Sequence, residues 1–380
     1  MKQFSKLPNV STSIFTVMSK MAADYGALNL SQGFPNFESD PILIEAVSKA
    51  MKEGYNQYAP MQGDLVLRER ISEKIESLYG KSYHPSTEIT LTAGATQAIF
   101  TAIAATIHKG DEVIVFAPAY DCYEPAIELF GGITKPLQLL PPFYRPNWDE
   151  VEETISANTK MIIINSPHNP SGMLFTKEDM LQLELLAEKH DLILLSDEVY
   201  EHIIFDGEKH QSAARFETLS QRTFITASFG KTFHNTGWKM GYCVAPEYLM
   251  KEFQKVHQYN VFCVNHPIQK GLATHLENPQ HYLSIPQFYE KKRDYFLKLI
   301  KGSRFKFTPS KGTYFQLLNY AEISSEKDVL FAEKLTKEYK LATIPTSVFN
   351  KNQEDFKQLR ICFAKTEQTL QEAARILNNI

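Results

Sequence analysis

Residues 160–200 read KMIIINSPHNPSGMLFTKEDMLQLELLAEKHDLILLSDEVY. The stretch has an apolar run over Lys160–Ile164, an amphipathic run over Lys177–His190 and a second apolar run over Leu192–Leu195. Short apolar runs are typical of buried strands, and apolar residues at helical spacing between them are typical of a helix that covers a sheet. The stretch therefore predicts a β-α-β unit with parallel strands.

The same alternation extends over residues 88–245 and predicts one doubly wound α/β domain with a mostly parallel sheet. Beside the unit above, strands are expected at Ile89–Leu91, Glu112–Phe116, Thr223–Ala227 and Tyr242–Ala245, and a helix at Thr96–Ile107. The pattern then changes and predicts a smaller α+β domain. Its expected elements are helices at Tyr282–Ile300, Asp328–Tyr339 and Glu367–Leu377 and strands at Arg304–Phe307, Thr313–Leu318 and Leu359–Phe363.

Composition and charge exclude several classes of protein. The chain has 380 residues, 43% of them hydrophobic, with a formal charge of −4 and four widely spaced cysteines. It shows no polybasic footprint, no apolar signal-peptide core and no zinc motif, so we expect a cytoplasmic protein without nucleic-acid, membrane or metal partners. Gly230-Lys231-Thr232 imitates the end of a P-loop, but the glycine required five residues earlier is Ile225.

Chemistry-bearing residues follow five of the expected strands, and ligands of open α/β sheets bind beyond the carboxyl ends of strands. These residues are Gly94, Ala95 and Thr96; Tyr120; Asn169; Asp197 and Tyr200; and Ser228 and Lys231. Each group alone has a structural interpretation, such as a turn, a packed aromatic ring or a surface lysine. Together they supply a phosphate cradle, an aromatic plate, an amide, a phenol, a buried acid and a lysine. Those groups suit a phosphorylated pyridine aldehyde, and the sequence predicts a site for pyridoxal 5′-phosphate.

The same residues carry a family resemblance. Six motifs resemble those of the class I and II aminotransferases, which are pyridoxal-phosphate enzymes of fold type I. The motifs are Gly94-Ala95-Thr96, Pro118-Ala119-Tyr120-Asp121, Asn169-Pro170-x-Gly172, Asp197-Glu198-Val199-Tyr200, Ser228-x-x-Lys231 and Gly237-Trp238-Lys239-Met240-Gly241. The resemblance runs from Leu30–Pro35 to Leu359–Phe363. Residues 56–61, 256–259 and 312–315 are most similar to the kynurenine aminotransferase and glutamine transaminase branch, above all to bacterial methionine aminotransferases.

The resemblance implies an architecture and a role for each cofactor residue. A large domain over residues 42–285 would hold a mostly parallel seven-stranded sheet, and residues 1–41 and 286–380 would form a small α+β domain. Lys231 would form the Schiff base and move the substrate proton, Asp197 would pair with the pyridine nitrogen, and Tyr200 and Asn169 would bind the ring oxygen. The remaining cofactor residues would be Tyr120, stacked on the ring, and Gly94, Ala95, Thr96, Ser228 and Lys239 at the phosphate. Tyr58 would reach the phosphate of a partner subunit, which implies a homodimer with shared active sites.

For the substrate, the resemblance implies that Arg360 binds the carboxylate, helped by Asn169 and by backbone near Gly33. Phe15, Tyr58 and Phe262 would line the side-chain pocket. None of these is a second cation for a dicarboxylic substrate, so the expected reaction moves the amino group of methionine or of an aromatic or apolar L-amino acid to a 2-oxo acid by a ping-pong mechanism. A carbon–sulfur β-lyase or a cyclopropane-forming synthase would use the same cofactor residues, and product analysis separates them from an aminotransferase.

Overall fold

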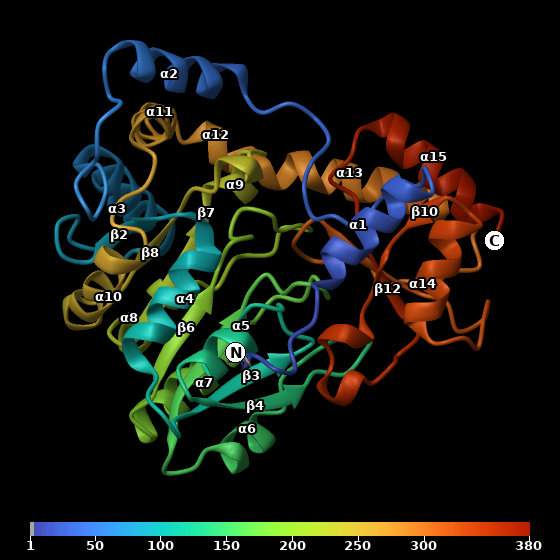
Figure 1. The fold of residues 1–380 in the computed structure, drawn as a ribbon, viewed down its shortest axis with the longest axis horizontal. Helices are drawn as coiled ribbons and strands as arrows, with labels where there is room; N and C mark the ends of the chain where they lie inside the picture. Colours follow the sequence, from blue (N-terminus) through green and yellow to red (C-terminus); the bar gives the residue numbers. More distant parts are fainter. Residues whose placement is uncertain (1–3) are drawn as a thin grey trace.

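A seven-stranded sheet forms the centre of the computed structural model, which describes residues 4–380 (Figure 1). The strand order is β2-β8-β7-β6-β5-β3-β4. The strands are β2 (Ile89–Thr92), β3 (Glu112–Ala117), β4 (Ile133–Gln138), β5 (Thr159–Asn165), β6 (Ile193–Asp197), β7 (Thr223–Ser228) and β8 (Gly241–Val244). Strand β8 is antiparallel to both of its neighbours, and the other pairs are parallel. The predicted, mostly parallel sheet is confirmed.

Strand β4 lies at the edge of this sheet and is the one strand of the sheet that sequence patterning missed; the two-residue strands β1 (Leu28–Asn29), β10 (Leu341–Ala342) and β11 (Ile344–Pro345), which lie outside this sheet, were missed as well. Its sequence, ITKPLQ, carries Lys135 and Pro136 and alternates only weakly. Proline is tolerated at a sheet edge because one side of an edge strand needs no backbone partner. Strand β4 pairs with β3 alone, whereas the apolar runs predicted as strands from the sequence, such as β5 and β6, are buried on both faces.

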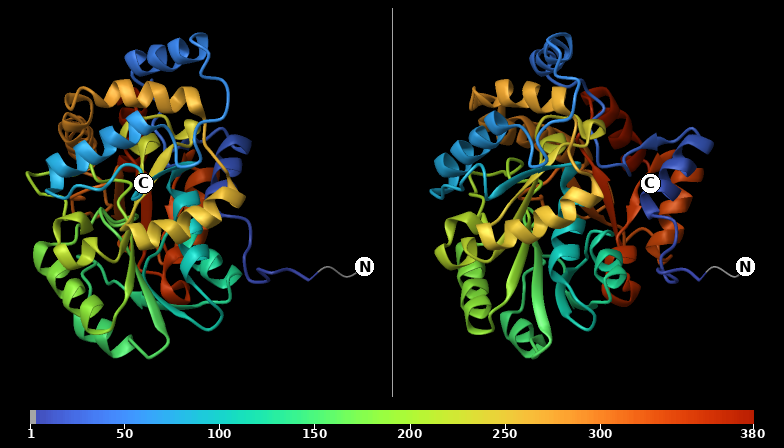
Figure 2. Two further views of the ribbon diagram at one scale, coloured as in Figure 1. Left: turned by 90° about the vertical axis from the view of Figure 1, so that its left-hand side faces the viewer. Right: turned by 60° about the vertical axis from the view of Figure 1, so that its left-hand side comes forward.

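Helices cover both faces of the sheet, as the two rotated views in Figure 2 show. The helices between residues 41 and 283 are α2 (Pro41–Lys52), α3 (Leu65–Tyr79), α4 (Gly94–Thr106), α5 (Tyr123–Leu129), α6 (Trp148–Thr154), α7 (Lys177–Lys189), α8 (Glu217–Ser220), α9 (Phe229–Thr232), α10 (Glu247–Asn260), α11 (His266–Leu276) and α12 (Gln280–Leu283). Of these, α2 packs against α11 and lies away from the sheet (Figure 1). Helix α7 begins with a capping box in which Thr176 and Asp179 satisfy each other's backbone N–H groups. No helix within residues 4–380 is long and apolar enough to cross a membrane.

A second core gathers both ends of the chain. Strands β11 (Ile344–Pro345), β12 (Gln358–Cys362) and β9 (Phe315–Asn319) form an antiparallel sheet, and β1 (Leu28–Asn29) pairs with β10 (Leu341–Ala342). Helices α1 (Ile14–Asp24), α13 (Ile285–Ile300), α14 (Asp328–Lys337) and α15 (Glu367–Asn378) complete it. Figure 1 shows α1, in blue, beside the red C-terminal elements. The domain boundaries at 41/42 and 285/286 stay a prediction.

Two expectations for this C-terminal part differ from the structure. Arg304–Phe307 is not a strand, because its pairing is limited to a single bridge between Lys306 and Asn319. The helix expected over Tyr282–Ile300 is divided into α12 and α13, and Pro286 stands in the first turn of α13. Proline suits a first turn and interrupts a continuing helix, because it lacks an N–H and clashes with the preceding turn.

Candidate active site

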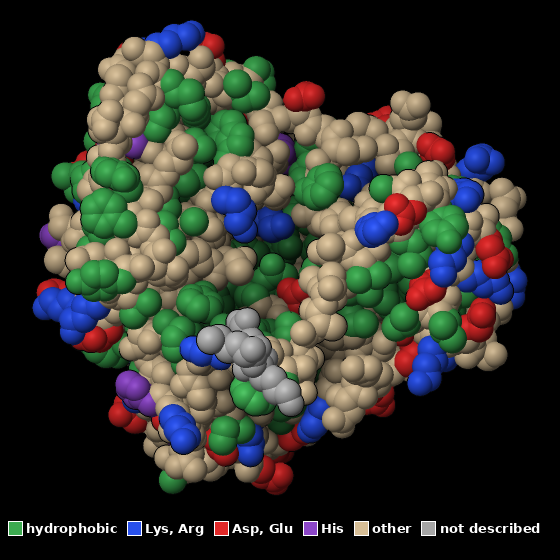
Figure 3. Space-filling model, in the orientation of Figure 1, with side chains coloured by type: hydrophobic (Ala, Val, Ile, Leu, Met, Phe, Trp, Pro, Cys, Tyr) green, Lys and Arg blue, Asp and Glu red, His purple; other side chains and the backbone are tan. Residues whose placement is uncertain are grey.

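All of the residues predicted to bind a cofactor, except Tyr58, converge on one cavity of about 180 Å³. It lies at the carboxyl ends of β5, β6 and β7 and is closed by residues of the second core. The face in Figure 3 is hollowed near its centre, where hydrophobic side chains and positive charges meet. Predicted residues that line the cavity are Phe15, Gly33, Gly94, Ala95, Thr96, Tyr120, Asn169, Asp197, Tyr200, Ser228, Lys231, Lys239 and Arg360.

The charges of the cavity are unbalanced. Among its lining residues, the charged ones are Lys231, Lys239 and Arg360 against the single carboxylate of Asp197. Three cations near one another in a partly enclosed site repel, and an anionic ligand would relieve that repulsion. The cavity therefore favours ligands that carry phosphate or carboxylate groups.

One wall of the cavity is the N-terminus of α4. This helix has no side-chain cap, so the N–H groups of its first turn are available to an anion. Gly94 has φ +75°, a left-handed conformation that favours glycine. Strand β8 passes so close that a Cβ on Gly241 would lie 2.5 Å from the Ala227 carbonyl oxygen and 3.0 Å from the Ala95 nitrogen. Gly94 thus lines the cavity beside Lys239, and Gly241 lets β8 pass close to the first turn of α4.

The segment Asp197–His202 divides its charged groups between two sides of the sheet end. Asp197 and Tyr200 line the cavity, whereas Glu198 and Glu201 point into the protein behind it. Glu198 accepts hydrogen bonds from Ser196 Oγ and the Ala213 N–H, and its Oε2 lies 2.7 Å from His210 Nε2. Glu201 forms a buried ion pair with Lys74 at 2.5 Å. These contacts anchor the segment from behind.

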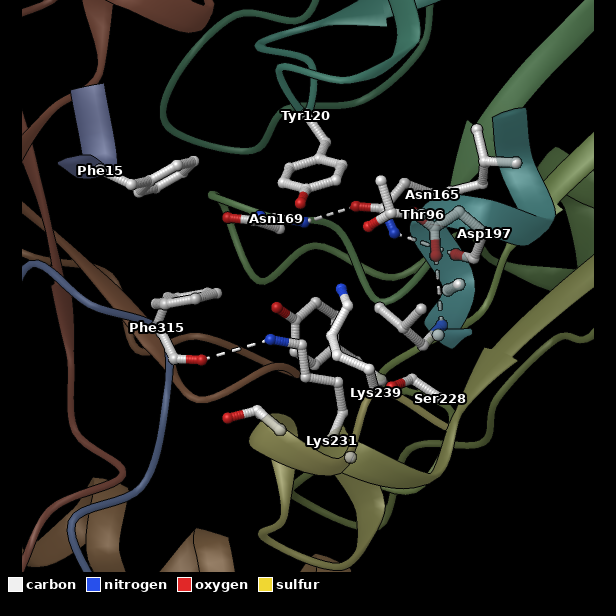
Figure 4. Close-up of a pocket in the computed structure, with 18 of the residues that line it drawn as sticks. Phe15, Thr96, Tyr120, Asn165, Asn169, Asp197, Ser228, Lys231, Lys239 and Phe315 are labelled. Atoms are coloured by element: carbon white, nitrogen blue, oxygen red, sulfur yellow. Dashed lines mark hydrogen bonds between the residues drawn. The ribbon is translucent and has the colours of Figure 1, made fainter. Parts of the chain in front are cut away.

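Asp197 is buried at the end of β6, with 3% of its surface exposed. Burial raises the pKa of its carboxyl to about 6, against the opposing effects of a hydrogen bond from Tyr123 and the nearby Lys231. Asn165 Nδ2 donates to the Asp197 carbonyl oxygen at 2.9 Å, and Asn165 Oδ1 accepts from the Asn169 N–H at 2.8 Å (Figure 4). The acid and the amide predicted from the two strand ends are therefore held in one network.

Lys231 points into the cavity from α9, opposite Asn169 and Tyr120 (Figure 4). Its Nζ donates to the Gly33 carbonyl oxygen at 3.2 Å and lies 5.9 and 5.7 Å from the ring centroids of Tyr200 and Tyr314. Burial, aided by the charges of Arg360 and Lys239, lowers the pKa of the Lys231 amine to about 8. About a tenth of a lysine with that pKa is neutral, and therefore nucleophilic, at pH 7.

Arg360 comes from β12 of the second core and is 1% exposed. Its Nη1 donates to Asn169 Oδ1 at 3.0 Å and its Nη2 to the Ser31 carbonyl oxygen at 2.9 Å. The ring centroids of Phe315 and Phe15 lie 3.9 and 4.9 Å from the guanidinium carbon. Arg360 Nε has no partner within residues 4–380, so this buried cation retains capacity to donate to a carboxylate.

Tyr58 and Phe262 are the two predicted site residues that do not line the cavity. They pack against each other with ring centroids 5.6 Å apart, and 83% of Tyr58 and 45% of Phe262 are exposed. Within one chain, the prediction that they line the side-chain pocket is therefore not met. Gly33 lines the cavity, but its carbonyl oxygen accepts from Lys231 and from Tyr314 Oη.

Sequence reasoning missed four residues that build the site. Tyr123 Oη donates to Asp197 Oδ2 at 2.5 Å, and Asn165, Tyr314 and Phe315 make the contacts given above. Two of these had signals, since Asn165 is the last residue of β5 and Tyr123 follows Tyr120 by three residues. Tyr314 and Phe315 lie in the stretch 312–315 that carries the family resemblance, but no sequence pattern places them at the site, to which the start of β9 brings them from far along the chain.

Comparisons with known proteins agree with this geometry. The family model described as aminotransferase class I and II matches residues 25–377. The chain belongs to the class I and II aminotransferases. Methionine aminotransferase of Escherichia coli is 46% identical, over 99% of this aminotransferase and 98% of that protein, and human kynurenine–oxoglutarate transaminase 3 is 33% identical, over 98% and 89%.

Solved structures confirm the fold of the aminotransferase. An Escherichia coli protein whose crystal structure identified a methionine aminotransferase function has a TM-score of 0.96 and 45% identity, and each chain is covered completely. A mutant aspartate aminotransferase from Thermus thermophilus has a TM-score of 0.91 and 28% identity, again with complete coverage of both chains. The predicted fold type I architecture and aminotransferase class are thus confirmed.

Aminotransferases of this class depend on pyridoxal phosphate, and the residues of the cavity fit that cofactor. The uncapped helix α4, with Gly94, Ser228 and Lys239, would hold the phosphate. Asp197 offers a buried carboxylate for a protonated ring nitrogen, and Tyr120 offers a ring face. Lys231 offers the amine for the aldehyde. These residues match the phosphate, the ring nitrogen and the aldehyde of the cofactor.

Proposed function

We propose that this aminotransferase takes methionine, or another apolar or aromatic L-amino acid, as its amino donor. The observation that carries the proposal is the surroundings of Arg360, whose guanidinium lies close to the rings of Phe15 and Phe315. The other two cations that line the cavity are Lys231 and Lys239, and each has a place in the cofactor set. A side-chain carboxylate, as in aspartate, would lose its hydration there without gaining a charged partner. The relative named methionine aminotransferase supports the same choice.

Bound pyridoxal phosphate supplies an electron sink for the electrons released when the substrate loses its Cα proton. The residues of this chain would do the rest. Arg360 would bind the α-carboxylate, and Asn169, which touches Arg360, would orient the donor beside it. Lys231, in its neutral form, would be the base that moves the proton between the substrate Cα and the cofactor. Tyr200 and the aromatic walls would exclude water from that amine.

Steady-state kinetics with a common 2-oxo acid acceptor test the substrate proposal. We expect kcat/KM to be highest for methionine, comparable for phenylalanine and roughly 100-fold lower for aspartate, since pairing a buried charge is worth several kcal/mol. A preference for aspartate would contradict the proposed pocket. Release of pyruvate and ammonia from a cysteine conjugate without an acceptor would indicate the β-lyase reaction instead.

The proposal extends to assembly and location. Tyr58 and Phe262 are exposed together outside the cavity, and Tyr259, three residues before Phe262 in the sequence, is 87% exposed. An exposed aromatic group of this kind fits an interface, and we propose a homodimer in which Tyr58 completes the phosphate site of the partner. We also propose a cytoplasmic location, because all four cysteines are free thiols.

A further inference from the structure

Tyr123 makes a contact with Asp197 that the roles above leave unexplained. The tyrosine is the first residue of α5 and is 2% exposed. Its Oη donates to Asp197 Oδ2 at 2.5 Å, and its ring packs edge-on against Tyr120 with centroids 5.9 Å apart. Burial raises the pKa of the Tyr123 phenol well above its usual value, an effect that the charge of Asp197 reinforces. The phenol therefore keeps its proton and acts as a donor.

The Asp197 carboxylate needs such a donor. It is buried, and a buried carboxylate without donors tends to take up a proton and lose its charge. The nearby charged groups oppose one another, since Lys231 favours the anion and Glu198 disfavours it. Tyr123 occupies Oδ2, whereas Oδ1 accepts a 3.4 Å contact from the Val199 N–H and no other hydrogen bond from residues 4–380. One carboxylate oxygen is thus held and the other remains for a proton donor in the cavity.

We propose that Tyr123 is a positioning residue of the cofactor site, whose hydroxyl fixes the Asp197 carboxylate and preserves its charge so that Oδ1 can bind the ring nitrogen of the cofactor. This inference rests on the proposed role of Asp197. Tyr123 does not line the cavity and forms no hydrogen bond with Arg360 or Lys231, so it acts on the cofactor through Asp197 and leaves the substrate carboxylate site unchanged.

The test compares holoenzymes of Tyr123→Phe, Asp197→Asn and the double variant. Loss of the visible cofactor absorbance after dilution gives the rate of pyridoxal phosphate release. A hydrogen bond to a charged group typically changes an equilibrium by a factor of ten or more, so we expect roughly 10-fold faster release from Tyr123→Phe. We also expect kcat to fall while KM for methionine stays within about twofold, because Arg360 is intact.

Tyr83→Phe is the matched control. Tyr83 is fully buried, and its hydroxyl has no hydrogen-bond partner within residues 4–380, so its loss should leave cofactor release unchanged. If Tyr123 acts through Asp197, the double variant should release cofactor at the rate of Asp197→Asn alone. In the double variant, the amide introduced by Asp197→Asn is neutral, so no buried charge is left unpaired. The double variant can therefore be compared with Asp197→Asn even if Tyr123→Phe alone folds poorly.

The outcomes separate this inference from the proposed function. Additive effects in the double variant, or release from Tyr123→Phe at the rate of Tyr83→Phe, would overturn the role of Tyr123 and leave that of Asp197 standing. Unchanged release from Asp197→Asn would overturn the assigned role of Asp197 and, with it, this inference.

Discussion

Arg360 is the residue on which substrate recognition depends most. Its guanidinium can form two parallel hydrogen bonds to a carboxylate, and its neighbours Asn169 and Ser31 fix its orientation. We expect Arg360→Ala to raise KM for methionine roughly 100-fold, because a buried charged pair is lost. Arg360→Lys should recover only part of this loss, because a lysine ammonium cannot form the two parallel hydrogen bonds that a guanidinium forms with a carboxylate. Near-normal kinetics of the alanine variant would refute the assignment.

Lys231 gives a prediction for pH. Burial lowers the pKa of its amine to about 8, and only the neutral amine can attack an aldehyde. The rate at which the apoenzyme captures pyridoxal phosphate should therefore rise with pH, with a midpoint near 8, and level off above it. Stopped-flow absorbance measures this rate, and Lys231→Ala should show no such step. A rate that is flat between about pH 6 and 9 would contradict the lowered pKa.

At the scale of elements, the close approach of β8 to β7 and α4 is a packing constraint with a functional effect. A Cβ at Gly241 would press on the Ala227 carbonyl and on the Ala95 nitrogen. We expect Gly241→Ala to cost about 1–3 kcal/mol of unfolding free energy and to weaken cofactor binding, because the first turn of α4 must shift.

Gly302→Ala is the control for that variant. Nothing lies within 4 Å of a Cβ at Gly302, and its backbone conformation is not left-handed. Denaturant unfolding and cofactor titration of both variants should separate the local clash from a general glycine effect. Equal unfolding free energies and cofactor affinities of the two variants would mean that the backbone near Ala95 shifts without a loss of stability.

Elements buried on both faces were predictable from sequence, and elements defined by distant contacts were not. Strands β5 and β6 are continuous apolar runs, so their position and the residues at their ends followed directly. The weakly alternating edge strand β4 escaped recognition. Most of the site followed the rule for strand ends, but the Tyr123–Asp197 contact and the rings around Arg360 depend on side-chain packing between distant segments.

At the scale of the whole molecule, the proposed homodimer predicts complementation between two defective chains. Lys231→Ala disables its own site, and Tyr58→Ala would impair the site of its partner. In a mixed dimer, one site would combine an intact Lys231 with an intact Tyr58. Unfolding the two variants together and refolding them should restore activity, up to about a quarter of the wild-type value if the chains pair at random. No recovery in dimers that demonstrably mix would place Tyr58 outside the partner's site.

Arg360 also connects the two cores of the molecule, since it extends from β12 to the Asn169 loop of the large sheet and to the Ser31 backbone. A carboxylate bound there would strengthen that junction, and a ligand that binds only the folded state raises its stability by about 2.7 kcal/mol at 100 times its dissociation constant. The melting temperature of the holoenzyme thus becomes a measure of occupancy. A melting series with amino acids and 2-oxo acids would rank candidate donors and acceptors before any product is assayed.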